Sequence, residues 1–180
     1  MRTLPGASMD KVESVARIVV SDAGPLIHLD EVGCLNLLAD FAQVLVPDAV
    51  WLEVARHRPS ALQCPGIPLS QTSHGEVISA ELEELARLFA LHPGEVQALH
   101  IAAQRRVEFL LTDDAAARLA ARHVGIPVHG TLGILLRAIR RGQRTASEVG
   151  IVLRSLPSAS SLHLKRSLLD EIVQIVDQVR

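Results

Sequence analysis

Short apolar runs alternate along the chain with stretches whose apolar residues recur at helical spacing. Residues 17–22 contain a β-branched run that ends in polar residues, and residues 26–38 behind them have helical periodicity. The same order returns at residues 44–46 and 48–56, with Pro47 at the start of the second helix. This alternation predicts a parallel sheet with helices on both faces.

The second half of the chain continues the alternation. Residues 58–76 are rich in Pro, Gly, Ser and Gln, so we expect a loop there, with an irregular strand near residues 67–69. The pattern then predicts helices at 77–91 and 94–106, a strand at 108–112, a helix at 115–123, a strand at 126–129 and a helix at 132–141. The expected fold is three-layer α/β/α, around a central and mainly parallel sheet of four to five strands.

Two closing helices are expected near the C-terminus. They cover residues 147–156 and 161–179, with a turn at residues 157–161 between them, and neither carries obvious chemistry. Residues 162–179 have enough apolar periodicity to serve either as core or as an interface helix.

The length of 180 residues suits one domain that buries its own core. We expect this domain to span residues 17–180, behind a flexible extension of residues 1–16 that lacks the apolar region of a secretory signal. The two cysteines, Cys34 and Cys64, have neither disulfide-framework nor zinc-site spacing, so a cytoplasmic location fits best. Charges interrupt every apolar run well before the roughly 20 residues of a membrane span, so no membrane association is expected.

Charge is unevenly distributed, although the formal net charge is only −2 at pH 7. Residues 105–144 contain eight arginines against three acids, which are Glu108, Asp113 and Asp114. Two interpretations stay open: the arginines lie on solvated outer faces of helices, or they form a track for a phosphate backbone. With three Phe, one Trp and no Tyr, base stacking cannot be the main mode of nucleic-acid recognition.

Acidic residues follow two of the predicted strands. Asp22 closes the first strand, and Asp113 and Asp114 follow the strand at residues 108–112. Ligands of an open parallel sheet bind at the carboxyl ends of its strands, so these side chains share one edge if the two strands are neighbours. The alternative for each position is a helix N-cap, because a helix follows in both cases.

Two glutamates belong to predicted helices. Glu53 lies next to Val50 and Val54, which are spaced i and i+4 and should face the sheet, so the Glu53 carboxylate borders the core. Glu95 falls in the first turn of the helix behind Pro93, where the helix dipole favours a negative charge even without a function. Each position taken alone is also typical of an ordinary surface residue.

Five short sequence motifs, which occur in this order, resemble those of a known family. They are residues 20–27 (VSDAGPLI), 46–54 (VPDAVWLEV), 92–99 (HPGEVQAL), 110–118 (LLTDDAAAR) and 130–133 (GTLG). Together they resemble the PIN domains, and in particular a prokaryotic branch related to the VapC-like toxins of toxin–antitoxin modules. By this resemblance Asp22, Glu53, Glu95 and Asp114 take the places of the PIN acidic quartet, with Asp113 in support.

The resemblance implies a PIN-like, Rossmann-like fold and the activity of a metal-dependent endoribonuclease. It also implies an RNA substrate, a Mg²⁺ or Mn²⁺ cofactor, a homodimer and inhibition by a small antitoxin protein. The expected metal ligands are Asp22, Glu95, Asp114 and Asp113, because converging carboxylates repel one another unless a cation neutralises them and oxygen ligands suit hard cations. The third acid is Glu95 where the better studied toxins have Asp, and either Asp113 or Asp114 can take the fourth place.

Two other functions stay open at this stage. One is a PIN-like module with weak or no catalysis that binds nucleic acid or protein, which Glu95, the mild acidity and the few aromatic residues favour. The other is a phosphoesterase that acts on small substrates. The eight histidines have no paired metal-ligand spacing, so no zinc site is expected.

Overall fold

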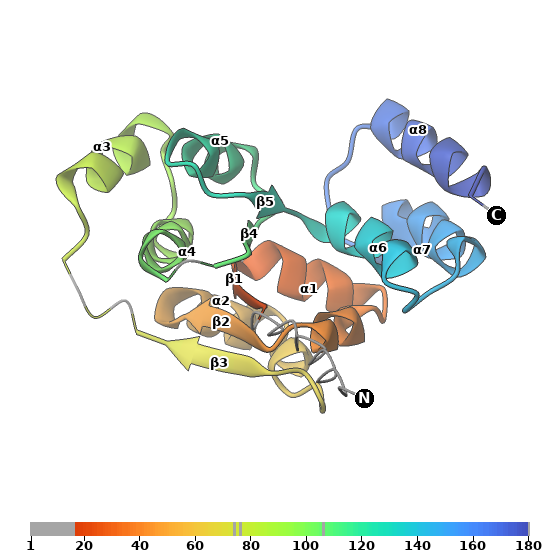
Figure 1. Ribbon diagram of the computed structural model, residues 1–180, viewed down its shortest axis with the longest axis horizontal. Coiled ribbons are helices and arrows are strands. Elements are labelled where there is room, and N and C mark those ends of the chain that lie inside the picture. The colour runs from red at the N-terminus through yellow and green to blue at the C-terminus, as the bar shows by residue number, and fades with distance from the viewer. Residues whose placement is uncertain (1–16, 74, 76, 106, 180) are drawn as a thin grey trace, which may run out of the picture.

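A five-stranded parallel sheet forms the centre of the molecule (Figure 1). The computed structural model describes residues 17–73, 75, 77–105 and 107–179, so the extension expected at residues 1–16 lies outside the described residues. The strands are β1 (Ile18–Ser21), β2 (Gln43–Pro47), β3 (Leu69–Thr72), β4 (Phe109–Leu111) and β5 (Val128–His129). Their spatial order is β3-β2-β1-β4-β5, and every pair is parallel. The prediction of a mainly parallel sheet of four to five strands is confirmed.

Helices cover both faces of this sheet, as the three-layer prediction requires (Figure 1). They are α1 (Ala23–Glu31), α2 (Asp48–His57), α3 (Ala80–Leu88), α4 (Pro93–Gln104), α5 (Ala115–His123), α6 (Thr131–Arg140), α7 (Ala146–Ala159) and α8 (Arg166–Asp177), with 3₁₀ turns η1 (Leu35–Asp40) and η2 (Pro59–Leu62). Successive strand residues alternate between two apolar layers: Val19 packs with α1, α2, α6 and α7, whereas Val20 packs with α3, α4 and α5.

The helix expected at residues 26–38 ends early. Gly33 adopts a left-handed φ of 65°, and the backbone N–H of Cys34 donates to the carbonyl of Leu29 at 2.8 Å. This reverse turn is a Schellman-type C-cap, which glycine stabilises because it carries no Cβ. The later apolar residues of the same run, Leu35, Leu37 and Leu38, are still buried, but from η1.

The predicted turn at residues 157–161 is wrong, because α7 continues through Pro157 to Ala159. Pro157 has no N–H to donate to the carbonyl four residues before it, and α7 ends two residues later. Residues 160–165 then form a linker without regular secondary structure, and α8 begins at Arg166 rather than at Ser161. The two closing helices pack against each other and against the α1 and α6 side of the core.

Within the described residues, no helix combines the length and apolar character needed to cross a membrane.

Candidate active site

The acidic residues meet at the carboxyl-terminal edge of the sheet. Strands β1 and β4 are neighbours, with Val20 opposite Leu110, so Asp22 and the Asp113–Asp114 pair leave the sheet side by side. This is also the point where the strand order reverses, since the chain moves outward from β1 to β3 and then returns to the other side of β1. A pocket of about 340 Å³ lies there, lined by residues that include Asp22, His28, Glu53, His92, Glu95, Asp113, Asp114, Ser161, Leu162 and His163.

Asp22 is the most buried of these carboxylates, with 8% of its surface exposed. Thr112 donates its hydroxyl to Asp22 Oδ2 at 3.1 Å, and no side-chain bond from Asp22 caps α1. Burial raises the pKa of Asp22 to about 7, and the nearby charges of Glu95 and Glu53 act in the same direction. The ionised form of Asp22 is therefore unfavourable in its buried position, and a bound cation would stabilise it.

Glu53 and Glu95 approach Asp22 from two helices. Val50 and Val54 of α2 are fully buried, as their spacing predicts, and this orientation brings Glu53 to the pocket. Gly94 at the start of α4 lies against α2, because a Cβ at this position would be 3.7 Å from Glu53 Oε2. Glu95 Oε2 accepts the backbone N–H of His92 at 2.7 Å and so caps its own helix. Burial raises the pKa of Glu95, with Asp114 and Glu53 adding to the effect.

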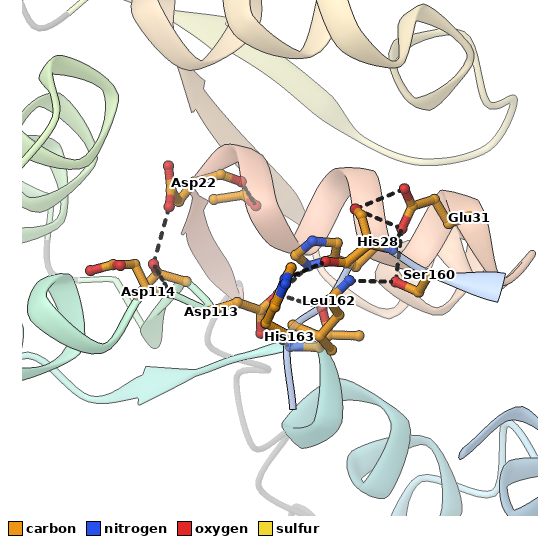
Figure 2. A network of polar contacts seen from close by, with 12 residues as sticks. Asp22, His28, Glu31, Asp113, Asp114, Ser160, Leu162 and His163 are labelled. Atoms are coloured by element: carbon orange, nitrogen blue, oxygen red, sulfur yellow. Dashed lines mark hydrogen bonds and ion pairs between the residues drawn. The ribbon is translucent and has the colours of Figure 1, made fainter. Parts of the chain in front are cut away.

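Asp114 and Asp113 have different surroundings. Asp114 is exposed in the pocket, and its Oδ1 accepts the backbone N–H of Ala117 at 2.8 Å, so it also caps α5. Asp113 accepts the backbone N–H of Thr131 at 2.8 Å on Oδ1, and on Oδ2 the Thr131 hydroxyl at 2.6 Å. The same Oδ2 lies 2.8 Å from His28 Nδ1, as Figure 2 shows. Asp113 thus joins α1 to the start of α6, whereas Asp114 faces the pocket with fewer partners.

A family model described as a PIN domain matches residues 18–178. The chain is a member of the PIN-domain family. PIN domains are generally nucleases and typically use divalent metal ions. No curated protein matches the sequence.

One wall of the pocket in this PIN domain comes from the α7–α8 linker, in residues that the sequence interpretation passed over. Glu31 at the end of α1 accepts the Ser160 hydroxyl and the Ser161 backbone N–H, both at 2.7 Å, and the Ser161 hydroxyl at 2.9 Å (Figure 2). Although partial burial opposes the effect, these bonds lower the pKa of Glu31. The anchored linker brings Ser161, Leu162 and His163 to the acidic pocket.

The pocket of the PIN domain suits a divalent cation in its chemistry. Its acidic donors are carboxylate oxygens, and one of them, on Asp22, is held in a buried position where its negative charge is unfavourable. Within the part of the chain that the structure describes, no three acidic, histidine or cysteine side chains stand close enough to hold one ion. The capping bonds of Glu95 and Asp114 explain this. Both carboxylates accept backbone N–H groups at helix N-termini, and they must turn away from them to bind one cation together with Asp22.

Proposed function

We propose that this PIN domain is a metal-dependent endoribonuclease and the toxin component of a toxin–antitoxin module. The observation that carries the proposal is the buried carboxylate of Asp22, set in one pocket with Glu53, Glu95 and Asp114 at the switch point of the sheet. The sequence motifs that resemble those of VapC-like toxins favour RNA as the substrate.

In this proposal each acid has a separate task. Asp22, Glu95 and Asp114 hold the cation, and Glu53 orients a water molecule from the α2 side of the pocket. A bound Mg²⁺ or Mn²⁺ supplies Lewis-acid stabilisation of the phosphate and lowers the pKa of bound water. Asp113 supports the site by fixing His28 and the start of α6, and it is the alternative fourth ligand.

Cleavage of a mixed RNA pool tests the proposal. Wild-type protein should cleave with Mg²⁺ or Mn²⁺ and not with EDTA, whereas Asp22→Asn should lower the rate by at least about a hundredfold. Asp170→Asn is the matched control, because Asp170 is an exposed aspartate on α8 whose side chain is 57% accessible. Wild-type cleavage by Asp22→Asn, with folding intact, would show that the catalytic site lies elsewhere.

The second candidate function is a binding module with weak or no catalysis. It is favoured by the capping bond of Glu95, which occupies one carboxylate oxygen at 2.7 Å, and by the longer side chain at this position. RNA that binds the protein in the presence of Mn²⁺ without being cleaved, in wild type and Asp22→Asn alike, would support this function. Cleavage of a chromogenic phosphodiester without a preference for polynucleotides would instead support a phosphoesterase.

Partners and location belong to the same proposal. We infer that a small antitoxin covers the acidic pocket, and that the protein works in the cytoplasm, where Cys34 and Cys64 remain free thiols. We also infer a homodimer. An apolar groove of about 460 Å³ lies between α6 and α8, and Ile175 and Val179 on its rim are 54% and 46% exposed.

Light scattering tests the homodimer. Wild-type protein should have the mass of two chains, and Ile175→Glu should shift it to one chain because a charge is placed in the apolar groove. Glu171→Gln on the same helix should leave the mass unchanged. A monomeric wild type at assay concentrations would contradict the homodimer.

A further inference from the structure

A second pocket, of about 550 Å³, lies at the end of the strands opposite the acidic site. Arg17, Glu108 and Pro127 come directly before β1, β4 and β5, so the pocket opens at the amino-terminal edge of the sheet. Its lining is completed by Phe109, His129 and three arginines at the end of α6, which are Arg137, Arg140 and Arg141. We call this site the arginine pocket.

Three of the four arginines share a single carboxylate. Asp40 Oδ2 lies 2.6 Å from Arg137 Nη1, 3.1 Å from Arg17 Nη1 and 3.2 Å from Arg141 Nε. The Arg137 side chain is 9% exposed, and its guanidinium carbon lies 4.5 Å from the centre of the Phe41 ring. The ion pair with Asp40 and the contact with the Phe41 ring hold this guanidinium in a mostly buried position.

The pocket keeps an excess of positive charge. Arg140 forms no ion pair within the described residues, and Glu108 is the other acid of the site besides Asp40. Four guanidinium groups thus face two carboxylates, which leaves two positive charges uncompensated in a concave surface. Such a surface concentrates the field of its charges and favours an anion.

The floor of the pocket is rigid and uncharged. The Phe109 ring packs edge-on against Phe41 and against His129, with ring centres 5.5 Å and 4.5 Å apart. Burial lowers the pKa of His129, and Arg140 and Arg118 lower it further, so the imidazole is neutral at physiological pH. The guanidinium groups around the rim therefore supply the binding charge.

One further arginine, Arg118, lies near the acidic site. Arg118 Nη1 lies 2.9 Å from the position that a Cβ on Gly130 would take, directly before α6. Helix α6 begins at Thr131, which binds Asp113, and ends at Arg140 in the arginine pocket. The two pockets are therefore separated by about 13 Å along this helix. Helix α6 follows β5, the edge strand of the sheet on this side.

We propose that the arginine pocket binds a phosphate group. The planar forks of guanidinium groups match phosphate oxygens in pairs, and the excess of positive charge supplies the attraction. A further step rests on the proposed nuclease function. The phosphate then belongs to the backbone of the RNA strand, a few nucleotides away from the phosphodiester bond that is cleaved in the acidic pocket. Free phosphate or a mononucleotide would present the same phosphate group to the pocket.

Binding in EDTA tests this proposal without requiring cleavage. A labelled single-stranded RNA is titrated with wild type, with the double variant Arg17→Gln and Arg140→Gln, and with Arg87→Gln, an exposed control on α3. The double variant should raise the Kd about tenfold and reduce the salt slope by about one for each arginine removed. Arg87→Gln should stay within about twofold of wild type. Arg137 is left intact, because its removal would disturb the core.

Calorimetry with inorganic phosphate and with AMP distinguishes the two sources. Loss of phosphate or AMP binding in the double variant, with unchanged RNA affinity, would support the pocket and overturn the RNA backbone as its ligand. Unchanged binding of RNA, phosphate and AMP in a folded double variant would overturn the pocket itself, as would a wild type that binds none of them. RNA binding that the double variant weakens, in a protein that never cleaves, would refute the nuclease and retain the pocket.

Discussion

Asp22 places a negative charge where water hardly reaches it, and this makes stability depend on pH. Its pKa is raised from 3.8 to about 7 in the folded protein. Between these values the unfolded chain has released the proton while the folded protein keeps it, so stability falls as pH rises and is lowest above pH 7. In the absence of metal the ionised carboxylate is thus a destabilising feature of the fold.

Replacement of this charge should stabilise the protein. In EDTA, Asp22→Asn should raise the free energy of unfolding by on the order of 2–4 kcal/mol at a pH above 7, with no gain near pH 4. Urea denaturation at the two pH values measures the difference. An equal effect at both pH values would mean that the substitution acts through packing, and no effect would mean that the charge of Asp22 is already compensated.

Asp113 and Asp114 should respond differently to the same substitution. Asp113→Asn loses charge-assisted bonds to His28 and Thr131, at a cost of about 2–3 kcal/mol, whereas Asn is a good N-cap at position 114, and its cost is below about 1 kcal/mol. If Asp114 is the fourth ligand, Asp114→Asn should weaken Mn²⁺ binding more than Asp113→Asn. Thermal unfolding measures the cost in stability, and Mn²⁺ titration measures the effect on metal binding. If Asp113→Asn weakened Mn²⁺ binding more than Asp114→Asn, Asp113 would be the fourth ligand instead of Asp114.

At the scale of elements, the α7–α8 linker depends on its attachment to α1. Glu31→Ala removes the acceptor of Ser160 and Ser161, so we expect a loss of about 1–2 kcal/mol in stability. Because the linker lines the acidic pocket, the KM for RNA should rise more than kcat falls. Glu84→Ala, at an exposed position of α3, is the matched control. Unchanged kinetics in a folded Glu31→Ala protein would show that the substrate does not touch the linker.

At the scale of the whole molecule, the two apolar layers share one sheet, and we propose that they unfold together. Leu153 of α7 and Leu99 of α4 lie in opposite layers, with 0% and 1% of their surface exposed. Each substitution to Ala should cost about 2–5 kcal/mol and shift a single transition. Fluorescence of Trp51 and circular dichroism should report the same midpoint in both variants. Separate midpoints in Leu153→Ala would mean that α7 and α8 form an independent unit.

The sequence by itself determined the local structure and the chemical inventory of this protein. Hydrophobic periodicity depends on neighbours within one turn or one strand, which is why β2, α2 and α5 appear close to their predicted bounds. The acids that follow strand ends, Asp22, Asp113 and Asp114, were visible for the same reason. Their capping alternative also holds for Asp114, which uses one oxygen for α5.

Only the tertiary structure decided how distant segments meet. The order of the strands places β1 beside β4 and so brings Asp22 to Asp113 and Asp114, and folding buries Asp22 enough to raise its pKa to about 7. The bonds from Glu31 to Ser161 span 130 positions, and the ion pair between Asp40 and Arg141 spans 101. Contacts at such separations leave no periodicity in the sequence, because they depend on the packing of whole elements rather than on neighbouring residues.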